Sequence, residues 1–205
     1  MAVRHGYGKI AGTDALVFAY DTGDTVNSYK GRPTTNYGPA SIGDWSAEAG
    51  SEGDTAEIIP TGNYYKGQPT YNCRTDTTQL YRGVYSIITD LSTIAGAGGT
   101  VTVSCMIRNN NSSTDQYINV FIGHDFSSVR SIAANSDWQK VQWTVDAANM
   151  NNNNVEFRPV TRVTDEYLEM TMPMVEVNVG YASPFVNGTR SATEGLIDLT
   201  GNSTL

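Results

Sequence analysis

The feature of this sequence that most constrains its fold is a period-two alternation of apolar and polar residues in short runs. Three segments carry it most clearly: Val101–Ile107, Ile118–Ile122 and Val141–Val145. Alternation of this kind predicts β-strands that turn one face toward a core. The runs are bounded by Gly, Asn, Asp and Ser, which favour turns. No segment keeps a helical apolar stripe over three turns, so the pattern predicts an all-β fold.

Further strands are expected at Glu57–Ile59, Gly83–Ile88, Val155–Val163 and Tyr167–Val179. Pro173 interrupts the last of these, and because proline cannot donate to a ladder, it predicts an edge position or a bulge. A single helical turn is expected at residues 90–94. The spacing of the strands predicts an antiparallel jelly-roll β-sandwich of about eight strands with extended N- and C-terminal arms.

A chain of 205 residues can bury one substantial core, so we expect one main domain with arms. The expected parts are an N-terminal docking arm (1–37), the jelly-roll domain (38–180) and a C-terminal tail (181–205). The N-terminal arm holds a compact apolar run, which needs a partner surface because a polar, Gly-rich segment cannot bury it alone. We expect this run to form docking and oligomer contacts in a homo-oligomer, a trimer being favoured; its residues are Leu16, Val17, Phe18 and Tyr20.

The charge of the chain argues against nucleic acid as a partner. It has 13 basic and 21 acidic residues, a net charge of -8, and no cluster of Lys and Arg. The longest uninterrupted apolar run, Ala15–Tyr20, is far shorter than a membrane span. Residues 1–25 lack the pattern of a secretory signal. We therefore expect a protein that neither enters a membrane nor is secreted.

The two cysteines, Cys73 and Cys105, allow one disulfide or none. Cys105 lies on the same side of its expected strand as Val103 and Ile107, where a small buried apolar residue belongs. The missing secretory signal also indicates a reducing compartment, in which structural disulfides are rare. We expect two buried thiols and no disulfide.

Catalytic chemistry is not expected. Glycoside hydrolysis needs two carboxylates at one sugar, and acidic residues on or near neighbouring expected strands are Glu156, Asp165, Glu166, Glu169 and Glu176. Glu156 and Glu169 fall on the polar side of their alternations, so we expect them on solvated strand faces. The two histidines, His5 and His124, are too few for a zinc site or a catalytic triad.

No cofactor is expected, although one turn is rich in oxygen ligands. Asp21-Thr22-Gly23-Asp24 would suit a structural calcium ion. An ordinary Asp-Gly turn explains the same residues equally well, so no metal ligands are assigned.

Sugar binding would need exposed aromatic rings, which stack on pyranose faces. Four of the twelve tyrosines lie in loop-like or polar context and form a candidate glycan platform: Tyr64, Tyr65, Tyr71 and Tyr81. Packing between subunits also uses tyrosine, and we favour that use. Trp138 and Trp143 are expected in the core.

Two connector segments resemble parts of tailed-bacteriophage structural proteins. Ser28–Asn36 reads SYKGRPTTN, similar to a phrase that leads into a carbohydrate-binding-module-like jelly roll in those proteins. Glu176–Ser191 is similar to the phrase that closes such a domain, with Ser183 where Thr is more usual. Asp137–Val145 resembles a WQxVxxT strand of the same modules.

The resemblance implies a non-enzymatic structural protein on a virion surface, assembled in the host cytoplasm. It would be a tail-fibre, neck-fibre or head-decoration subunit. Its expected partners are capsid, neck or tail proteins, which it would meet through its N-terminal arm, and surface glycans. The alternative is a free carbohydrate-binding module associated with a polysaccharide-degrading enzyme.

Overall fold

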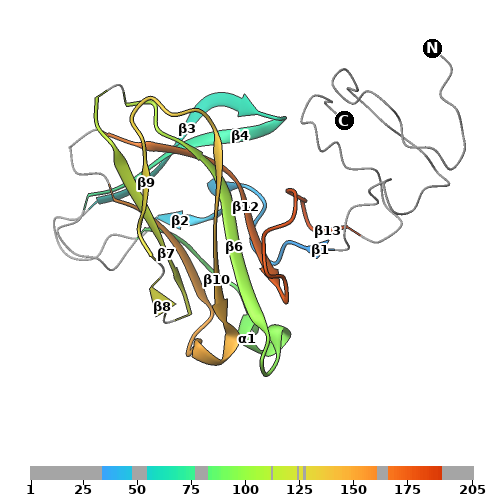
Figure 1. The fold of residues 1–205 in the computed structure, drawn as a ribbon. Coiled ribbons are helices and arrows are strands. Elements are labelled where there is room, and N and C mark those ends of the chain that lie inside the picture. The colour runs from blue at the N-terminus through green and yellow to red at the C-terminus, as the bar shows by residue number, and fades with distance from the viewer. Residues whose placement is uncertain are drawn as a thin grey trace, which may run out of the picture. The chain divides into compact units, whose positions relative to one another are not determined.

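The protein forms an antiparallel β-sandwich with one short helix, as Figure 1 shows. The computed structural model describes residues 34–47, 55–76, 83–111, 113–123, 125–126, 128–160 and 166–190. Thr34–Thr189 is one compact unit. The all-β sandwich predicted from the alternation is therefore confirmed.

The strands lie in two layers. The first sheet has the order β10 (Gln139–Asp146), β6 (Thr100–Arg108), β12 (Leu168–Val177), β4 (Gln68–Asp76) and β3 (Thr55–Tyr65). The second sheet has the order β2 (Ser46–Ala47), β5 (Val84–Ile87), β11 (Asn154–Val160) and β7 (Gln116–Ile122), with β8 (Asp125–Phe126) and β9 (Arg130–Ile132) beside β7. A parallel contact between Thr75 and Val160 joins the layers.

The short elements complete the unit. They are β1 (Thr34–Thr35), which pairs with β13 (Thr189–Arg190), the helix α1 (Leu91–Ala95), and the 3₁₀-helices η1 (Ile42–Asp44) and η2 (Ala147–Asn149). Among the described strands, eight are four residues or longer, which agrees with the predicted number. In the same part of the chain, no helix is long and apolar enough to cross a membrane.

The core lies between the layers and follows the predicted alternation. The inward side chains of β6 are all buried: Val101, Val103, Cys105 and Ile107. Trp45 reaches into the core from the start of β2, and its ring lies 5.1 Å from that of Phe157. Burial of one such side chain contributes about 1.5–3 kcal/mol. The core therefore carries most of the stability of the sandwich.

Two features of the first sheet differ from the sequence prediction. β4 was not predicted, because its sequence has no apolar alternation, yet β3 and β12 pair with it on either side. The second difference is in β6, where the polar residues Thr102 and Ser104 are as buried as the apolar ones. Thr102 and Ser104 lie on the outer face of the first sheet, and chain segments from both ends of the compact unit cover that face.

A β-bulge at Pro173 is the point at which these segments attach. β12 is an inner strand between β6 and β4, so the predicted edge position is wrong and the predicted bulge is confirmed. Next to Pro173, Met172 has a left-handed backbone with φ 52°. The Asn36 amide fills the gap: its Nδ2 donates to Pro173 O at 2.9 Å, and its Oδ1 accepts from Val175 N at 2.9 Å. A side chain thus restores the hydrogen bonds that the bulge removes from the ladder.

Residues 181–189, here called the closing strap, lie beside β1 on the same face. The buried Glu176 carboxylate accepts a hydrogen bond from Thr34 Oγ1 at 2.5 Å and one from Ser183 N at 2.9 Å. Lys140 Nζ donates to Ala182 O at 3.0 Å and to Ser183 O. Desolvation lowers the pKa of this ammonium, and the nearby Glu176 carboxylate acts against the shift. The two connector segments therefore meet around one carboxylate.

The predicted docking run lies outside the described residues. This applies to Leu16, Val17, Phe18 and Tyr20, and to the Asp21–Asp24 turn. Docking through residues 1–37 and the trimeric state stay predictions. Residues 34–37 and the closing strap belong to the compact unit.

Asn36→Ala tests the role of the bulge. It leaves Val175 N–H and Pro173 C=O buried without partners, and we expect a loss of about 2–4 kcal/mol in the free energy of unfolding. Urea denaturation followed by circular dichroism measures it. The exposed Asn151→Ala variant is the control and should change stability by less than about 0.5 kcal/mol. Equal stabilities of the two variants would contradict the role of Asn36.

The cysteines give a second prediction. Cys73 and Cys105 are buried free thiols, and burial raises the pKa of each far above its usual range. Because the thiolate is the reactive form, neither should react with iodoacetamide in the native protein. Mass spectrometry should find both alkylated only after unfolding in guanidinium. Labelling of either thiol under native conditions would show that its strand opens.

Candidate functional site

An aromatic and charged row crosses the outer face of the second sheet. Glu156 on β11 lies opposite Tyr85 on β5 and opposite Phe121 on β7. Residues that face each other across strands turn their side chains to the same face. The neighbours of Glu156 in the chain, Val155 and Phe157, are buried in the core, so the row points outward. A carboxylate thus lies between two half-buried aromatic rings.

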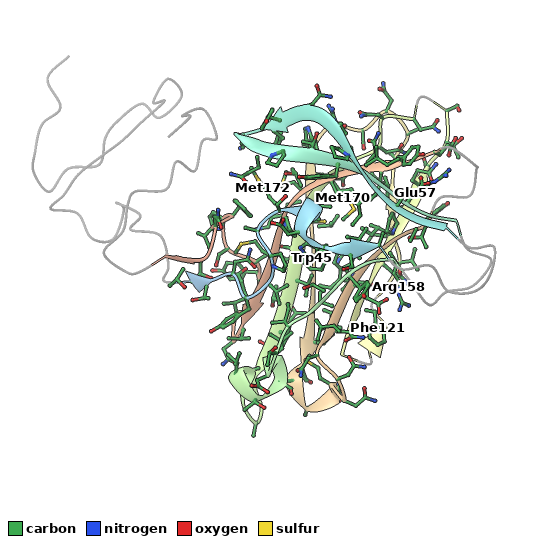
Figure 2. All side chains as sticks on the ribbon, turned by 180° about the vertical axis from the view of Figure 1, so that it is seen from behind. Trp45, Glu57, Phe121, Arg158, Met170 and Met172 are labelled. Atoms are coloured by element: carbon green, nitrogen blue, oxygen red, sulfur yellow. The ribbon has the colours of Figure 1, made fainter. Side chains whose placement is uncertain are left out.

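Arg158 fixes this carboxylate. Its Nη2 and Nε lie 2.6 and 2.9 Å from Glu156 Oε2, and its guanidinium is 4.9 Å from the centre of the Phe121 ring. Figure 2 shows Arg158 and Phe121 close together. The predicted solvated position of Glu156 is wrong, since both charged residues are buried. Two positions apart on one strand, they share a face and neutralise each other.

Asn119 adds a hydrogen-bond acceptor beside the row. It lies opposite Arg158 in the register of β7 and β11. The residue is buried, and its Oδ1 has no hydrogen-bond partner in the described part of the chain. A buried acceptor without a donor is costly, so this oxygen is suited to a donor supplied by a ligand. Tyr117, half-buried on the same strand, adds a third ring to this face.

These groups suit a sugar. Aromatic rings stack on the apolar face of a pyranose, while a carboxylate, a guanidinium and an amide bind its hydroxyl groups. All of these residues lie on paired strands rather than in loops. The surface is therefore held in position before a ligand arrives. Among the described residues, no group of three His, Cys, Asp or Glu side chains is placed to hold a metal ion.

The predicted tyrosine platform is spread over different places. Tyr64 is exposed at the end of β3, and Tyr65 beside it stacks on Trp138 with ring centres 4.6 Å apart. Tyr71 lies on β4 and not in a loop. Tyr81 lies outside the described residues. Trp138 was expected in the core and is instead half-buried in this ring pair.

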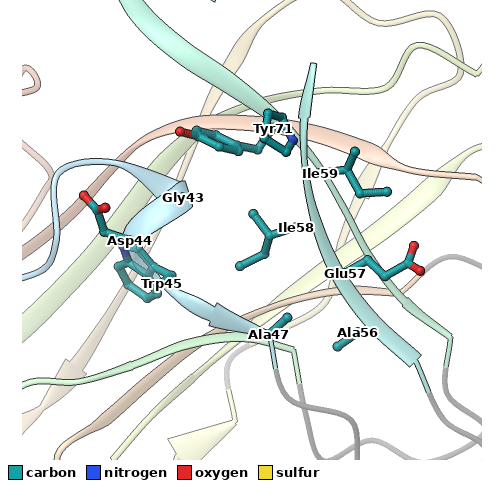
Figure 3. Close-up of a pocket in the computed structure, with 10 residues that line it drawn as sticks. Gly43, Asp44, Trp45, Ala47, Ala56, Glu57, Ile58, Ile59 and Tyr71 are labelled. Atoms are coloured by element: carbon teal, nitrogen blue, oxygen red, sulfur yellow. The ribbon is translucent and has the colours of Figure 1, made fainter. Parts of the chain in front are cut away.

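Tyr71 belongs to an open groove of about 540 Å³ between the edge strands β2 and β3. Its hydroxyl lies 3.1 Å from that of Ser41, and its ring packs on Gly43, where a Cβ would come within 2.5 Å of the hydroxyl. In Figure 3 Ile58 points into the groove, whereas the carboxyl groups of Asp44 and Glu57 point away. The groove is therefore mixed in character, with the Tyr71 hydroxyl beside apolar side chains such as Ile58.

Solved structures with a similar fold are carbohydrate-binding modules. The CBM22-1 xylan-binding domain of Xyn10C from Paenibacillus barcinonensis has a TM-score of 0.44 and 11% identity, over 74% of this chain and 97% of that one. The family 30 module of the cellulosomal cellulase Cel9D-Cel44B of Clostridium thermocellum has a TM-score of 0.32 and 16% identity, over 74% and 95%. No protein-family model and no curated protein matches the sequence. Likenesses this distant do not assign a ligand to this chain.

The sequence analysis missed the row on the second sheet. Its one detectable signal was Glu156-Phe157-Arg158, in which opposite charges two residues apart share a strand face. Tyr85 and Phe121 gave no signal of their own. Only the order of the strands, with β11 between β5 and β7, brings Tyr85 and Phe121 to the Glu156–Arg158 pair.

The buried ion pair gives a third prediction. Arg158→Leu leaves the Glu156 carboxylate buried without its cation, and we expect a loss of about 3–5 kcal/mol in the free energy of unfolding. The double variant Glu156→Leu/Arg158→Leu removes both charges and should recover most of that loss. Urea denaturation of the two variants and the wild type measures the difference. A double variant as unstable as the single one would show that the loss does not come from leaving Glu156 without its cation.

Proposed function

We propose that this protein is a non-catalytic carbohydrate-binding module whose binding surface is the outer face of the second sheet. The observation that carries the proposal is the row of Tyr85, Glu156 and Phe121, with Arg158 holding the carboxylate. The unpaired Oδ1 of Asn119 supports it, since a sugar hydroxyl would supply the missing donor.

The spacing of the row indicates the form of the ligand. Tyr85 and Phe121 lie on strands separated by β11, so their positions are about 9–10 Å apart. One pyranose ring is too small to stack on both. Each ring would therefore contact a different sugar of one chain, and the buried Glu156–Arg158 pair would hold the surface between the rings in place. The ligand that fits is an extended oligosaccharide or polysaccharide, not a monosaccharide.

The setting that we propose is a module attached to, or working with, a polysaccharide-degrading enzyme. The connectors at both ends of the unit bond to the Glu176 carboxylate, so the two ends of the sandwich are held together within the unit. Such a unit keeps its binding face whatever domain is joined to it. The virion surface expected from the connector resemblance stays a prediction, which mass spectrometry of purified phage particles would test.

Ring removal at the row is the fourth prediction. Tyr85→Ala and Phe121→Ala should each weaken binding of a soluble oligosaccharide by about ten-fold or more, which is about 1.4 kcal/mol. Isothermal titration calorimetry against cellulose- and xylan-derived hexasaccharides measures the affinity. Tyr181→Ala is the matched control, because Tyr181 is exposed on the closing strap, and it should bind like the wild type. Wild-type affinity in both Tyr85→Ala and Phe121→Ala would contradict the proposed site.

A further inference from the structure

A second polar and aromatic row crosses the outer face of the first sheet, away from the row described above. Glu169 on β12 lies opposite Arg108 on β6 and opposite Asn72 on β4. Leu168 and Met170, on either side of Glu169, are buried in the core. The three polar side chains therefore share the outer face.

The Glu169 carboxylate is bonded on one side only. Arg108 Nε and Nη2 both lie 2.8 Å from Oε2, and Asn110 Nδ2 lies 2.6 Å from the same oxygen. Within the described part of the chain Oε1 has no partner, although Glu169 is only 2% exposed. Arginine usually pairs with both oxygens of a carboxylate. Here all the donors converge on one oxygen, so the other still needs a donor.

Asn72 offers the complementary group. Its half-buried side chain neighbours Glu169 in the register, and its amide makes no hydrogen bond within the described residues. An unpaired carboxylate oxygen accepts a hydrogen bond, and an amide can both donate and accept. The Asn72 amide is the accessible one of the two groups and can bond to a sugar hydroxyl, with the buried Glu169 carboxylate beside it.

Aromatic side chains border this row on the side of β10. The Arg108 guanidinium lies 4.9 Å from the centre of the Trp138 ring, on which Tyr65 stacks. Tyr65 reaches this place because the pairing of β3 with β4 is irregular between Pro60 and Tyr64, where Gly62 has φ 76°. In Figure 1 the β3–β4 hairpin bends at the end of the sandwich. The bend brings a hairpin residue to the start of β10.

Charges on this face are paired, which favours an uncharged ligand. Arg108 pairs with Glu169, and next to them Arg74 Nε lies 2.7 Å from Glu57 Oε2. The Tyr167 hydroxyl donates to the same Glu57 oxygen at 3.2 Å. The charges of these residues cancel, and beside the ring pair Lys66, 5.7 Å from the centre of the Tyr65 ring, and Asp137 add one charge of each sign. Ile59, 40% exposed beside Asn72, adds apolar surface.

We infer that the outer face of the first sheet holds a second saccharide-binding site, formed by Glu169, Asn72 and Trp138. Its ligand class, a neutral oligosaccharide, rests on the proposed function, whereas its residues and its sheet are different. Two sites on opposite faces of one sandwich would let a single module contact two sugar chains, or two parts of one. Avidity would then exceed the affinity of either site.

Trp138 provides a fluorescence signal at this site, and the Trp138→Phe variant separates it from that of Trp45, which lines the β2–β3 groove. Trp45 and Trp143 are each 5% exposed in the core, and Trp138 is the half-buried one of the three tryptophans. Titration with soluble neutral oligosaccharides, such as cellohexaose and xylohexaose, should change the emission with saturation. The change should persist in Tyr85→Ala, which lacks a ring of the first row, and disappear in Trp138→Phe.

Asn72→Leu removes the amide next to Glu169 and keeps a side chain of similar size. It should weaken the fluorescence-detected binding by about ten-fold or more. The matched control is Asn151→Leu, at an exposed turn outside both rows, which should bind like the wild type. Circular dichroism and urea denaturation show whether each variant keeps the wild-type fold.

Three results would overturn the inference. They are no change of emission with any oligosaccharide up to about 1 mM, a concentration that detects binding of about -4 kcal/mol; loss of the change in Tyr85→Ala; or an unchanged response in Asn72→Leu. Calorimetric binding that depends on Tyr85 without a Trp138 response would keep the proposed function and reject this site. A Trp138 response combined with unchanged binding in Tyr85→Ala and Phe121→Ala would keep this second site and reject the first row as a binding site.

Discussion

The hydrogen bonds of Asn36 at the Pro173 bulge are the interaction on which the rest of the first sheet depends. Pro173 has no N–H, and the bulge beside it breaks the ladder of an inner strand. The Asn36 amide supplies one donor and one acceptor at that place. Glu176 then binds Thr34 and Ser183, so both connectors lie on the same face. This explains why the polar residues of β6 are buried there.

Each sheet carries on its outer face an ion pair with a buried carboxylate, and the two pairs are built differently. Glu156 and Arg158 lie on one strand, whereas Glu169 and Arg108 lie on neighbouring strands. Buried pairs of this kind add little net stability, because desolvation offsets their attraction. Their effect is to hold charged and amide groups in fixed positions beside aromatic rings. A β-sandwich with two such faces is suited to binding rather than to chemistry that needs moving parts.

The open groove between β2 and β3 is built differently from the two outer faces. Tyr71 and Ile58 line it, and the carboxyl groups of Asp44 and Glu57 point away from it (Figure 3). An extended sugar chain needs partners for its hydroxyl groups as well as an apolar contact. On the paired strands of the sheets, the register fixes which side chains are neighbours. The outer faces of the sandwich therefore offer ordered rows of partners for an extended saccharide.

The fold class and most of the long strands were predictable from the sequence, and so was an edge position or a bulge at Pro173, because side-chain alternation and the missing proline N–H act locally. It also indicated that Cys105 and Trp143 are buried. The tertiary structure alone decided which strands are neighbours. Strand order brings Tyr85 and Phe121 to Glu156, places Tyr65 on Trp138 and leaves Tyr71 elsewhere. Strand pairing also places Arg108 beside Glu169, a neighbour that alternation could not assign, whereas Arg158 shares a strand face with Glu156 in the sequence itself.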